Sequence, residues 1–232
     1  MLSEPIGYVE DPKWYEETSF IDSNFVEVVE NEFIHVDMQY PQLKMKKAEP
    51  RCFLRKDAYE LLEDAGHMLP EGMRFRIWDA WRPFELQEEL YYAYSAQIIR
   101  DFNLQGKSKE EQDATIGKYV AIPKNTPSNP PAHTTGGAID LTIETAEGNI
   151  LDMGSGFDEF SARTQTTYYE SSDNEIVKNN RRMLFNIMTN AGFTNLPSEW
   201  WHYDYGDMNW AYLNSRPAIY KGVFTKNEIN ME

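Results

Sequence analysis

The sequence predicts an α+β fold: one domain in which a small, mainly antiparallel sheet is flanked by helices. Segments that alternate apolar and polar residues, as strands do, are mixed along the chain with segments whose apolar residues recur at helical spacing. Of the 232 residues, 41% are hydrophobic and 14% aromatic, enough to fill one large core. Because no internal repeat or interdomain linker divides the sequence, we expect residues 1–232 to form a single domain.

The first half of the chain supplies two predicted strands and two predicted helices. Residues 1–31 have no clear period and are expected to lie on the periphery. Residues 32–38 alternate and predict a strand, and residues 56–67 carry apolar side chains at the spacing of an amphipathic helix. A second alternating strand starts at residue 73, and a long helix follows over 84–102.

The second half of the chain begins with a change in amino-acid composition. Over residues 105–131 a charged, partly helical stretch gives way to a segment with four prolines. A loop of this length inside a compact domain is usually functional, so we expect a long loop or partly helical insertion beside a site. Residues 175–191 have helical periodicity and end at Gly192, which predicts a C-cap. The aromatic stretch 198–205 follows a proline and predicts a last strand.

Charge and hydropathy limit the partners of this protein. The 22 basic and 38 acidic residues give a net charge of −16, which argues against nucleic acid and anionic membrane surfaces as partners. No window has the roughly 18 continuous apolar residues that a membrane span requires. The acidic N-terminal stretch lacks a basic segment followed by an apolar one, so no secretory signal is visible and a cytoplasmic location is expected.

Cysteine and histidine are scarce, which shortens the search for a metal site. Cys52 is the single cysteine, so an internal disulfide or a thiolate cluster cannot form, and we interpret it as buried apolar filler. Any metal site must therefore use His, Asp and Glu. Among the four histidines, His35 and His67 have no companion pattern and are interpreted as structural.

One stretch brings a histidine and a carboxylate together. A loop rich in Pro, Ser and Asn ends at His133, and two glycines then lead into an alternating strand whose polar face carries Asp140. A carboxylate in the middle of such a strand faces either solvent or a polar site, and our hypothesis is that Asp140 and His133 share a zinc ion. A catalytic zinc ion typically has three protein ligands and one open position, and His202 can supply the third ligand.

Glu199 precedes His202 by three residues and can exchange a proton between zinc-bound water and a leaving amine. On a straight strand, residues three apart point to opposite faces. The pair therefore requires a bulge or twist between the two residues, or Glu199 must reach from the start of the strand. The sequence is compatible with either arrangement.

The spacing of these residues is similar to that of a known family. His133 and Asp140, with six residues between them, followed by the run EWWH at 199–202, resemble the zinc-binding pattern of the D-alanyl-D-alanine dipeptidases. These form a VanX-like branch of zinc peptidases that also include D,D-carboxypeptidases and the hedgehog signalling domain. Further segments resemble this branch in the same order: residues 78–83, 138–142, 152–158 and 180–193.

The resemblance implies a hedgehog/D,D-peptidase-like fold and a zinc-dependent hydrolase that cleaves D-alanyl-D-alanine, or a close D,D-dipeptide, to free D-amino acids. His133, Asp140 and His202 would bind one zinc ion per chain. Glu199 would act as general base toward zinc-bound water and then as general acid. Arg82 would stabilise the oxyanion of the tetrahedral intermediate, because its planar guanidinium stays charged.

The resemblance also implies a site for the free amino group of the substrate, to which Asp158 and Tyr40 correspond. One position departs from the family: a serine usually lies two residues before the first histidine ligand, and here Pro131 has neither a hydroxyl nor a backbone N–H. This departure affects the expected substrate preference and leaves the zinc ligands unchanged. Nearby hydroxyl groups could take over the contact: Thr134, Thr135 and Ser128.

Two other functions fit the same pattern. The first is a D,D-carboxypeptidase or peptidoglycan endopeptidase on the same zinc site, which Pro131 and the long 105–131 segment keep open. The second is a non-catalytic zinc- or peptide-binding domain, against which Glu199 and Arg82 argue, because a purely structural site needs neither. In the absence of a metal site, Arg82 would pair with Asp79 as a buried ion pair.

Other polar and aromatic residues near these motifs are interpreted as structural. Asp204 and Asp207 are expected to be solvated. Tyr94 and its neighbours at 91–92 are expected to pack on their helix rather than line a site. Trp200 and Trp201 are expected to fill the core and the pocket wall, because aromatic rings alone specify little.

Overall fold

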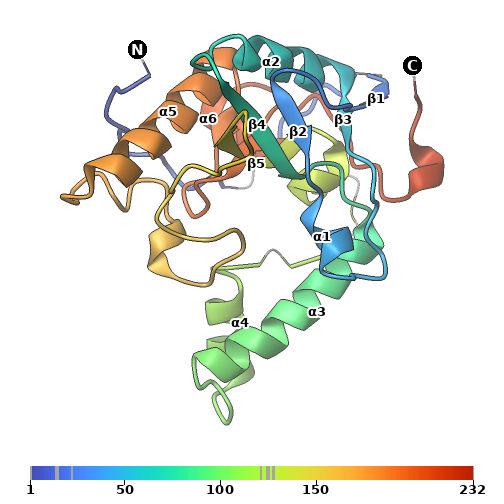
Figure 1. Ribbon diagram of the computed structural model, residues 1–232. Coiled ribbons are helices and arrows are strands. Elements are labelled where there is room, and N and C mark those ends of the chain that lie inside the picture. Colours follow the sequence, from blue (N-terminus) through green and yellow to red (C-terminus); the bar gives the residue numbers. More distant parts are fainter. Residues whose placement is uncertain are drawn as a thin grey trace.

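A five-stranded sheet forms the centre of the computed structural model, which describes residues 2–13, 16–21, 23–120, 122–123, 126 and 129–231 (Figure 1). The first two strands in sheet order pair in parallel and the remaining pairs are antiparallel, as predicted for a mainly antiparallel sheet. The order is β2 (Ile34–Val36), β4 (Met73–Asp79), β5 (Ala138–Thr145), β7 (His202–Asp204) and β6 (Thr194–Asn195).

Six α-helices surround the sheet in the described part of the chain, which confirms the predicted α+β class. They are α1 (Gln39–Gln42), α2 (Lys56–Gly66), α3 (Phe84–Asp101), α4 (Lys109–Ile116), α5 (Glu175–Ala191) and α6 (Met208–Asn214). The predictions for 56–67, 84–102 and 175–191 are confirmed, and Gly192 ends α5 with a φ of 111°. None of the described helices is both long and apolar enough to cross a membrane.

The main core lies between the sheet and the pair α2 and α5, which pack against each other (Figure 1). The apolar face of β5, Ile139, Leu141 and Ile143, is wholly buried there against side chains from both helices. Trp200 and Trp201 belong to the same cluster, as predicted. The opposite face of β5 is therefore left for polar side chains, and these are buried as well.

A second, two-stranded sheet joins β1 (Phe25–Glu27) to β3 (Phe53–Arg55). β1 comes from the segment expected at the periphery, yet Phe25 is wholly buried. Its ring packs edge-on against Trp81, and it fills the space beside Gly136, where an added Cβ would lie 2.2 Å from the ring. The expectation that this segment lies on the periphery is wrong for β1, because its aromatic ring packs against the loop that follows His133.

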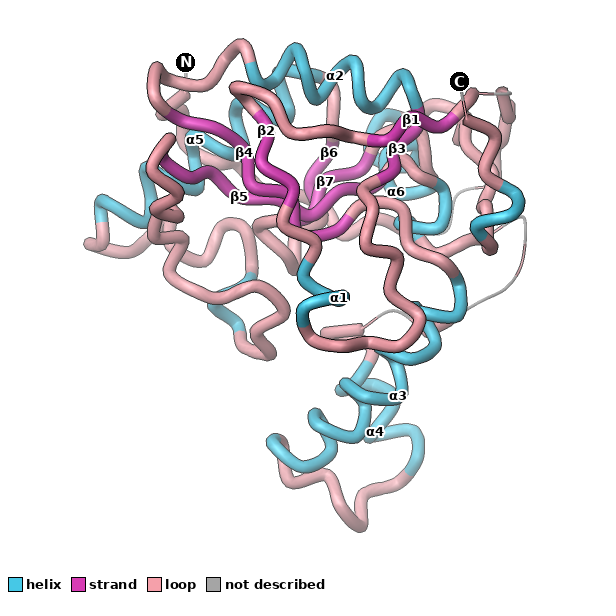
Figure 2. The backbone as a smooth tube through the Cα atoms, turned by 45° about the vertical axis from the view of Figure 1, so that its right-hand side comes forward, coloured by secondary structure: helices cyan, strands magenta, loops and turns pink. Residues whose placement is uncertain are grey.

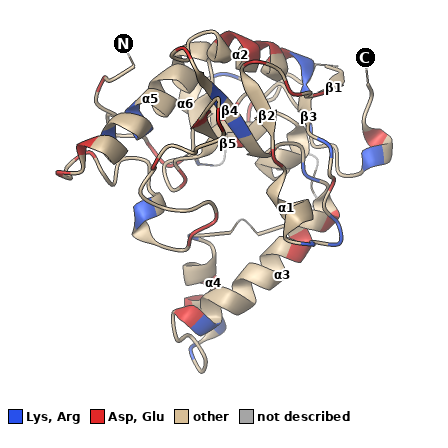
Figure 3. Ribbon diagram, in the orientation of Figure 1, with Lys and Arg blue, Asp and Glu red and all other residues tan. Residues whose placement is uncertain are grey.

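Helices α3 and α4 extend together away from the sheet in both views (Figures 1 and 2). α4 lies within the 105–131 segment and starts with a capping box, in which Ser108 and Glu111 each bond the other's backbone N–H. Acidic residues are spread over the helices and loops of the whole molecule, often with Lys or Arg beside them (Figure 3). The segment predicted to be partly helical thus contains one short helix in its described part, and this helix packs on α3.

The predicted strand 198–205 is correct only for its second half. β7 covers His202–Asp204, and the residues before it form turns. The backbone N–H of Glu199 donates to Leu196 (3.0 Å), and that of His202 donates to Glu199 (3.3 Å). These turns use the backbone N–H groups of Glu199 and His202, so regular pairing with β5 begins only at His202, although the carbonyl of Trp201 still accepts from Leu141 (3.0 Å).

Candidate active site

Strand register brings two candidate ligands, together with Asp79, to one face of the sheet. Asp140 on β5 lies directly opposite His202 on β7, and on its other side it pairs with Asp79 at the end of β4. Directly opposed residues in antiparallel strands point to the same face. The polar row across β4, β5 and β7 therefore faces away from the main core.

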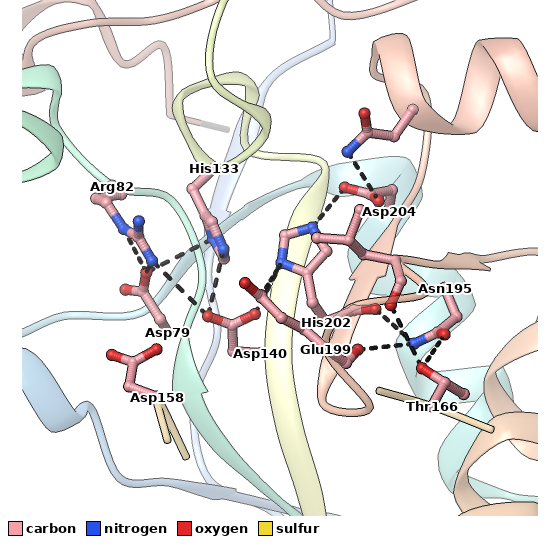
Figure 4. A network of polar contacts seen from close by, with 12 residues as sticks. Asp79, Arg82, His133, Asp140, Asp158, Thr166, Asn195, Glu199, His202 and Asp204 are labelled. Atoms are coloured by element: carbon pink, nitrogen blue, oxygen red, sulfur yellow. Dashed lines mark hydrogen bonds and ion pairs between the residues drawn. The ribbon is translucent and has the colours of Figure 1, made fainter. Parts of the chain in front are cut away.

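His133 reaches this row from a short 3-10 helix, Ala132–Thr135, which ends at Gly136 in the left-handed conformation (φ 75°). The turn folds the histidine back over β5, so that its Nε2 lies 3.3 Å from Oδ2 of Asp140. His202 Nδ1 lies 2.9 Å from Oδ1 of the same carboxylate. The structure thus brings together the three residues that the sequence nominated (Figure 4).

In each histidine, the ring nitrogen that does not face Asp140 forms a hydrogen bond that fixes the orientation of the ring. Nδ1 of His133 donates to the carbonyl of Ala80 (2.7 Å), and Nε2 of His202 bonds to Oδ1 of Asp204 (2.8 Å). Because a carbonyl can only accept, the bond to Ala80 requires a proton on Nδ1 of His133, so Nε2 is the nitrogen that can bind a metal. Ring nitrogens fixed in this way are typical of metal-binding histidines.

The donor set can hold a metal ion. One ligand atom from each of His133, Asp140 and His202 lies within 4.8 Å of the others, and all three residues are buried. Two imidazole nitrogens with one carboxylate oxygen are a common zinc set in proteins.

The charges around this set favour a cation. Burial alone would raise the pKa of Asp140, but His133 and His202 hold it well below its usual range. Burial would lower the pKa of His202, whereas the carboxylates of Asp204 and Asp140 raise it well above its usual range. Both shifts favour positive charge at the point where the three ligand atoms converge, and a divalent cation would supply it.

Glu199 lies beside the three candidate ligands, on the turn that precedes β7. Its Oε2 is 3.9 Å from Nδ1 of His202, and its side chain keeps 26% of its exposure. Of the two arrangements left open by the sequence, the chain uses the second, because Glu199 reaches the site from before the start of the strand. The amide of Asn195 holds the turn by donating to the carbonyls of Glu199 (3.1 Å) and His202 (3.0 Å) (Figure 4).

The environment of Glu199 changes its acidity. Enclosure by the cavity walls raises the pKa of Glu199 to about 8, with the charges of Asp140 and Asp158 adding to the rise and His202 opposing it. A carboxyl group with a pKa near neutrality can both take up and release a proton under physiological conditions.

Arg82 lies on the side of the three candidate ligands opposite to Glu199. Its guanidinium donates to Asp79 (2.8 Å), Gln87 (2.7 Å) and the Tyr40 hydroxyl (3.2 Å), and its Nη2 is 3.8 Å from Oδ2 of Asp140. The buried ion pair with Asp79 and the position beside the candidate ligands therefore coexist. Burial would lower the pKa of Arg82, but its anionic and hydroxyl neighbours raise it, so the side chain keeps its charge.

Asp158 and Tyr40 also meet here, although 118 residues separate them in the chain. The Tyr40 hydroxyl donates to Oδ2 of Asp158 (2.9 Å), and the Tyr94 hydroxyl donates to the same oxygen (2.7 Å). Burial raises the pKa of Asp158 to about 6, against the effect of the two hydroxyls. The interpretation of Tyr94 as packing alone is wrong; its spacing from Gln87 and Leu90, on one face of α3, is the sequence signal that points to the site.

These residues share one cavity of about 500 Å³. Its walls include the metal-binding candidates and further polar residues: Tyr40, Arg82, Gln87, Tyr94, Asp158 and Glu199. Residues 117, 119–120 and 129–131 of the segment around α4 also line it. Four carboxylates face the cavity, from Asp11, Asp140, Asp158 and Glu199, so its interior suits a positively charged group.

Two further expectations from the sequence need correction. Asp204 and Asp207 are not solvated, with exposures of 0% and 1%. β7 lies between β5 and β6, which buries Asp204 against His202, and Asp207 caps α6 by accepting from the backbone N–H of Trp210 (3.0 Å).

Two of the three hydroxyl groups expected to replace the missing serine, those of Thr134 and Thr135, already form hydrogen bonds within the protein. Thr134 and Thr135 donate to the backbone carbonyls of Pro131 and Ala132, each at 2.7 Å, so neither has its proton free for a substrate. Ser128 lies outside the described residues. By contrast, His35 and His67 are structural as predicted, since one bonds Glu144 (2.7 Å) and the other caps α2.

The chain is similar to proteins of one known family. The family profile described as D-ala-D-ala dipeptidase matches residues 42–220, a range that contains every candidate site residue except Tyr40. A D-alanyl-D-alanine dipeptidase of Synechocystis sp. (strain ATCC 27184 / PCC 6803 / Kazusa) is 36% identical over 150 residues, which cover 59% of this chain and 61% of that protein. One from Escherichia coli (strain K12) is 35% identical over 158 residues, covering 67% and 68%.

The matched part therefore spans less than two thirds of the Synechocystis protein's own length. Among solved structures, VanYB in complex with D-alanine-D-alanine is 16% identical, with a TM-score of 0.40 over 75% of this chain and 84% of that one. The family match alone covers well over half of the present sequence. The chain belongs to the D-ala-D-ala dipeptidase family of peptidases.

Proposed function

We propose that this protein is a zinc-dependent dipeptidase that hydrolyses D-alanyl-D-alanine, or a close D,D-dipeptide, to free D-amino acids. The observation that carries the proposal is the convergence of His133, Asp140 and His202 beside Glu199 and Arg82 in one cavity, in a member of this family. Relatives named D-alanyl-D-alanine dipeptidase support the choice of substrate.

The three ligands would hold zinc through Nε2 of His133, a carboxylate oxygen of Asp140 and Nδ1 of His202. Bound zinc supplies a Lewis acid that brings the ionisation of water into the neutral range. Ala80 and Asp204 keep the two rings turned toward the metal by bonding their other nitrogens.

Glu199 transfers a proton from the attacking water to the leaving group. Its carboxylate accepts a proton from the attacking water and delivers it to the nitrogen of the leaving D-alanine, so that the C–N bond breaks with loss of a neutral amine. A cation at the nearby ligands would lower the raised pKa of this group and keep it in the accepting form before attack.

Arg82 stabilises the charge that develops on the carbonyl oxygen of the scissile bond. Its contacts with Asp79, Gln87 and Tyr40 fix the guanidinium before the reaction, so little reorganisation is needed when charge appears. Asp158, with Tyr40, receives the free amino group of the dipeptide. Asp158 is half-buried in the cavity wall, so an acylated amino group would leave its carboxylate without a cationic partner, at a cost in binding free energy.

The proposal is tested by measuring release of D-alanine from the dipeptide by zinc-loaded protein. We expect turnover of D,D-dipeptides, none of L,L-dipeptides, loss of turnover with a chelator and recovery on adding zinc. Absence of turnover of any D,D-dipeptide would refute it. Preferential trimming of a pentapeptide stem would instead favour a D,D-carboxypeptidase on the same residues.

A further inference from the structure

The two carboxylate oxygens of Asp158 have different surroundings. Oδ2 accepts two hydrogen bonds, from Tyr94 (2.7 Å) and from Tyr40 (2.9 Å). Oδ1 accepts none from the described residues, and Asp158 lines the cavity that contains the candidate ligands. One oxygen is thus saturated by the protein, and the other is available inside the cavity.

The backbone at Asp158 is also unusual. Its φ is 54°, in the left-handed region that residues other than glycine seldom occupy. Such a conformation persists only where the surrounding contacts hold it, and it recurs at ligand-binding positions. The two tyrosine hydroxyls are the side-chain contacts that hold the Asp158 carboxylate in this conformation.

Packing contacts hold the ring of Tyr94 in place. Its ring packs edge-on against Phe160, with ring centroids 5.1 Å apart, and lies between two apolar clusters. One cluster joins Tyr40 to Leu86 and Leu90 of α3, and the other joins Ile98 of α3 to Ile116 of α4. The hairpin of α3 and α4 therefore fixes the hydroxyl that Asp158 accepts.

We propose that Tyr94 is a positioning residue for substrate recognition. Its hydroxyl and that of Tyr40 occupy Oδ2 of Asp158, which turns Oδ1 toward the primary ammonium group of the dipeptide. This inference deepens the function proposed above and rests on it for the identity of the substrate. It assigns to the α3–α4 hairpin the task of setting the amino-terminal specificity of the site.

Charge complementarity supports this assignment. The titratable and charged groups around Asp158 come from several elements: Tyr40 of α1, Tyr94 of α3, Lys118 after α4, Arg82 after β4, Asp140 of β5 and Glu199 before β7. Of the two cations, Arg82 already pairs with Asp79, and the exposed Lys118 forms no ion pair with Asp158. An arriving ammonium group would therefore complete the charge balance at Oδ1.

The test removes only the hydroxyl group. Tyr94→Phe keeps the ring and its packing on Phe160, so the fold should be retained. We expect KM for D-alanyl-D-alanine to rise about tenfold, the loss that follows removal of one hydrogen bond to a charged group, with kcat within about twofold. Tyr92→Phe, on the same helix but 68% exposed, is the matched control and should change neither constant. An unchanged KM in Tyr94→Phe would overturn the proposal.

A double-mutant cycle shows whether Tyr94 acts through Asp158. In an Asp158→Asn background, Tyr94→Phe should have no further effect on KM, whereas independent, additive losses would overturn the proposal.

A readout without turnover separates this inference from the proposed function. In a ¹³C NMR titration assigned with Asp158→Asn, Tyr94→Phe should raise the pKa of the Asp158 carboxyl, and an unchanged pKa would overturn the proposed contact. If the wild-type protein does not cleave the dipeptide, the proposed function fails, while this titration still decides the role of Tyr94.

Discussion

Each of the two candidate histidine ligands is fixed on the side away from Asp140. A backbone carbonyl holds His133 and a buried carboxylate, Asp204, holds His202. Such partners select the tautomer and the ring orientation and so reduce the entropy lost when a metal binds. Among the described residues, no hydrogen bond anchors the side chain of Glu199 in the same way; its backbone is held by Asn195, and its carboxylate is partly exposed to the cavity.

Glu199→Gln should separate catalysis from metal binding. The amide keeps the size of the side chain but cannot accept a proton, so we expect kcat to fall by roughly 10²–10⁴-fold. Zinc content, measured by elemental analysis after gel filtration, should stay near one per chain. A coincident loss of zinc would show that Glu199 is a ligand rather than the proton carrier.

The raised pKa of Asp158 predicts how kcat/KM changes with pH on the acidic side of its profile. With a pKa of about 6, Asp158 is protonated below that pH and ionised above it. Because only the carboxylate can pair with an ammonium group, kcat/KM should rise as the pH increases through about 6 and then level off. Steady-state kinetics in zinc-loaded protein check this, and Asp158→Asn, which cannot ionise, should lack this rise while keeping a low and level kcat/KM.

At the scale of elements, the loop that carries His133 depends on a glycine and on a strand far away in sequence. Gly136 adopts a φ of 75° directly over the ring of Phe25 in β1. The amino-terminal strand thus contributes to the site without touching it, because it limits where the 3-10 helix of His133 can lie. This is also why β1 is buried although its sequence has no strong period.

Gly136→Ala should disturb both stability and metal binding. The left-handed backbone costs about 1–2 kcal/mol for alanine, and the clash with Phe25 roughly 1–3 kcal/mol more. Gly148→Ala is the matched control, since its φ is 87° but a Cβ there meets no atom within 4 Å. Denaturant unfolding and zinc titration should show a smaller loss and unchanged zinc affinity for the control. Equal effects of the two substitutions would contradict this account.

At the scale of the whole molecule, the site lies where three separate parts of the fold meet. The central sheet supplies Asp140 and His202, the β1–β3 layer braces His133, and the α3–α4 hairpin supplies Tyr94. The polar face of the sheet is buried beneath them, so its carboxylates require cationic partners. Arg82 pairs with Asp79, and Arg74 and Arg76 pair with Glu144. A metal ion would supply the positive charge beside Asp140.

Removing zinc should therefore lower the stability of the entire domain. A ligand at 100 times its dissociation constant stabilises the native state by about 2.7 kcal/mol. For a chain of this length that corresponds to a rise in Tm of roughly 5–10 °C. Calorimetry with chelator and then with added zinc checks this, and Asp140→Asn should abolish the shift. A Tm that does not respond to zinc in the wild-type protein would contradict the assigned ligands.

The sequence by itself determined the parts of this protein whose signals are local. Alternation and helical spacing predicted β2, β4, β5, α2, α3 and α5, because burial of one face imposes a period on each element. The motif residues at 133, 140, 199 and 202 could also be nominated, since their chemistry and spacing were readable. The family match then agreed with the resemblance that these residues carry.

Only the tertiary structure decided the rest. The strand at 198–205 gave way to turns because the backbone there bonds to itself, and this placed Glu199 before β7. Asp204 was misjudged because the neighbouring strands β5 and β6 bury β7. Tyr94 was misjudged because its partner, Asp158, lies 64 residues away in the sequence. Residue type and period describe one element at a time, whereas the burial and the hydrogen bonds of a side chain depend on which elements pack together.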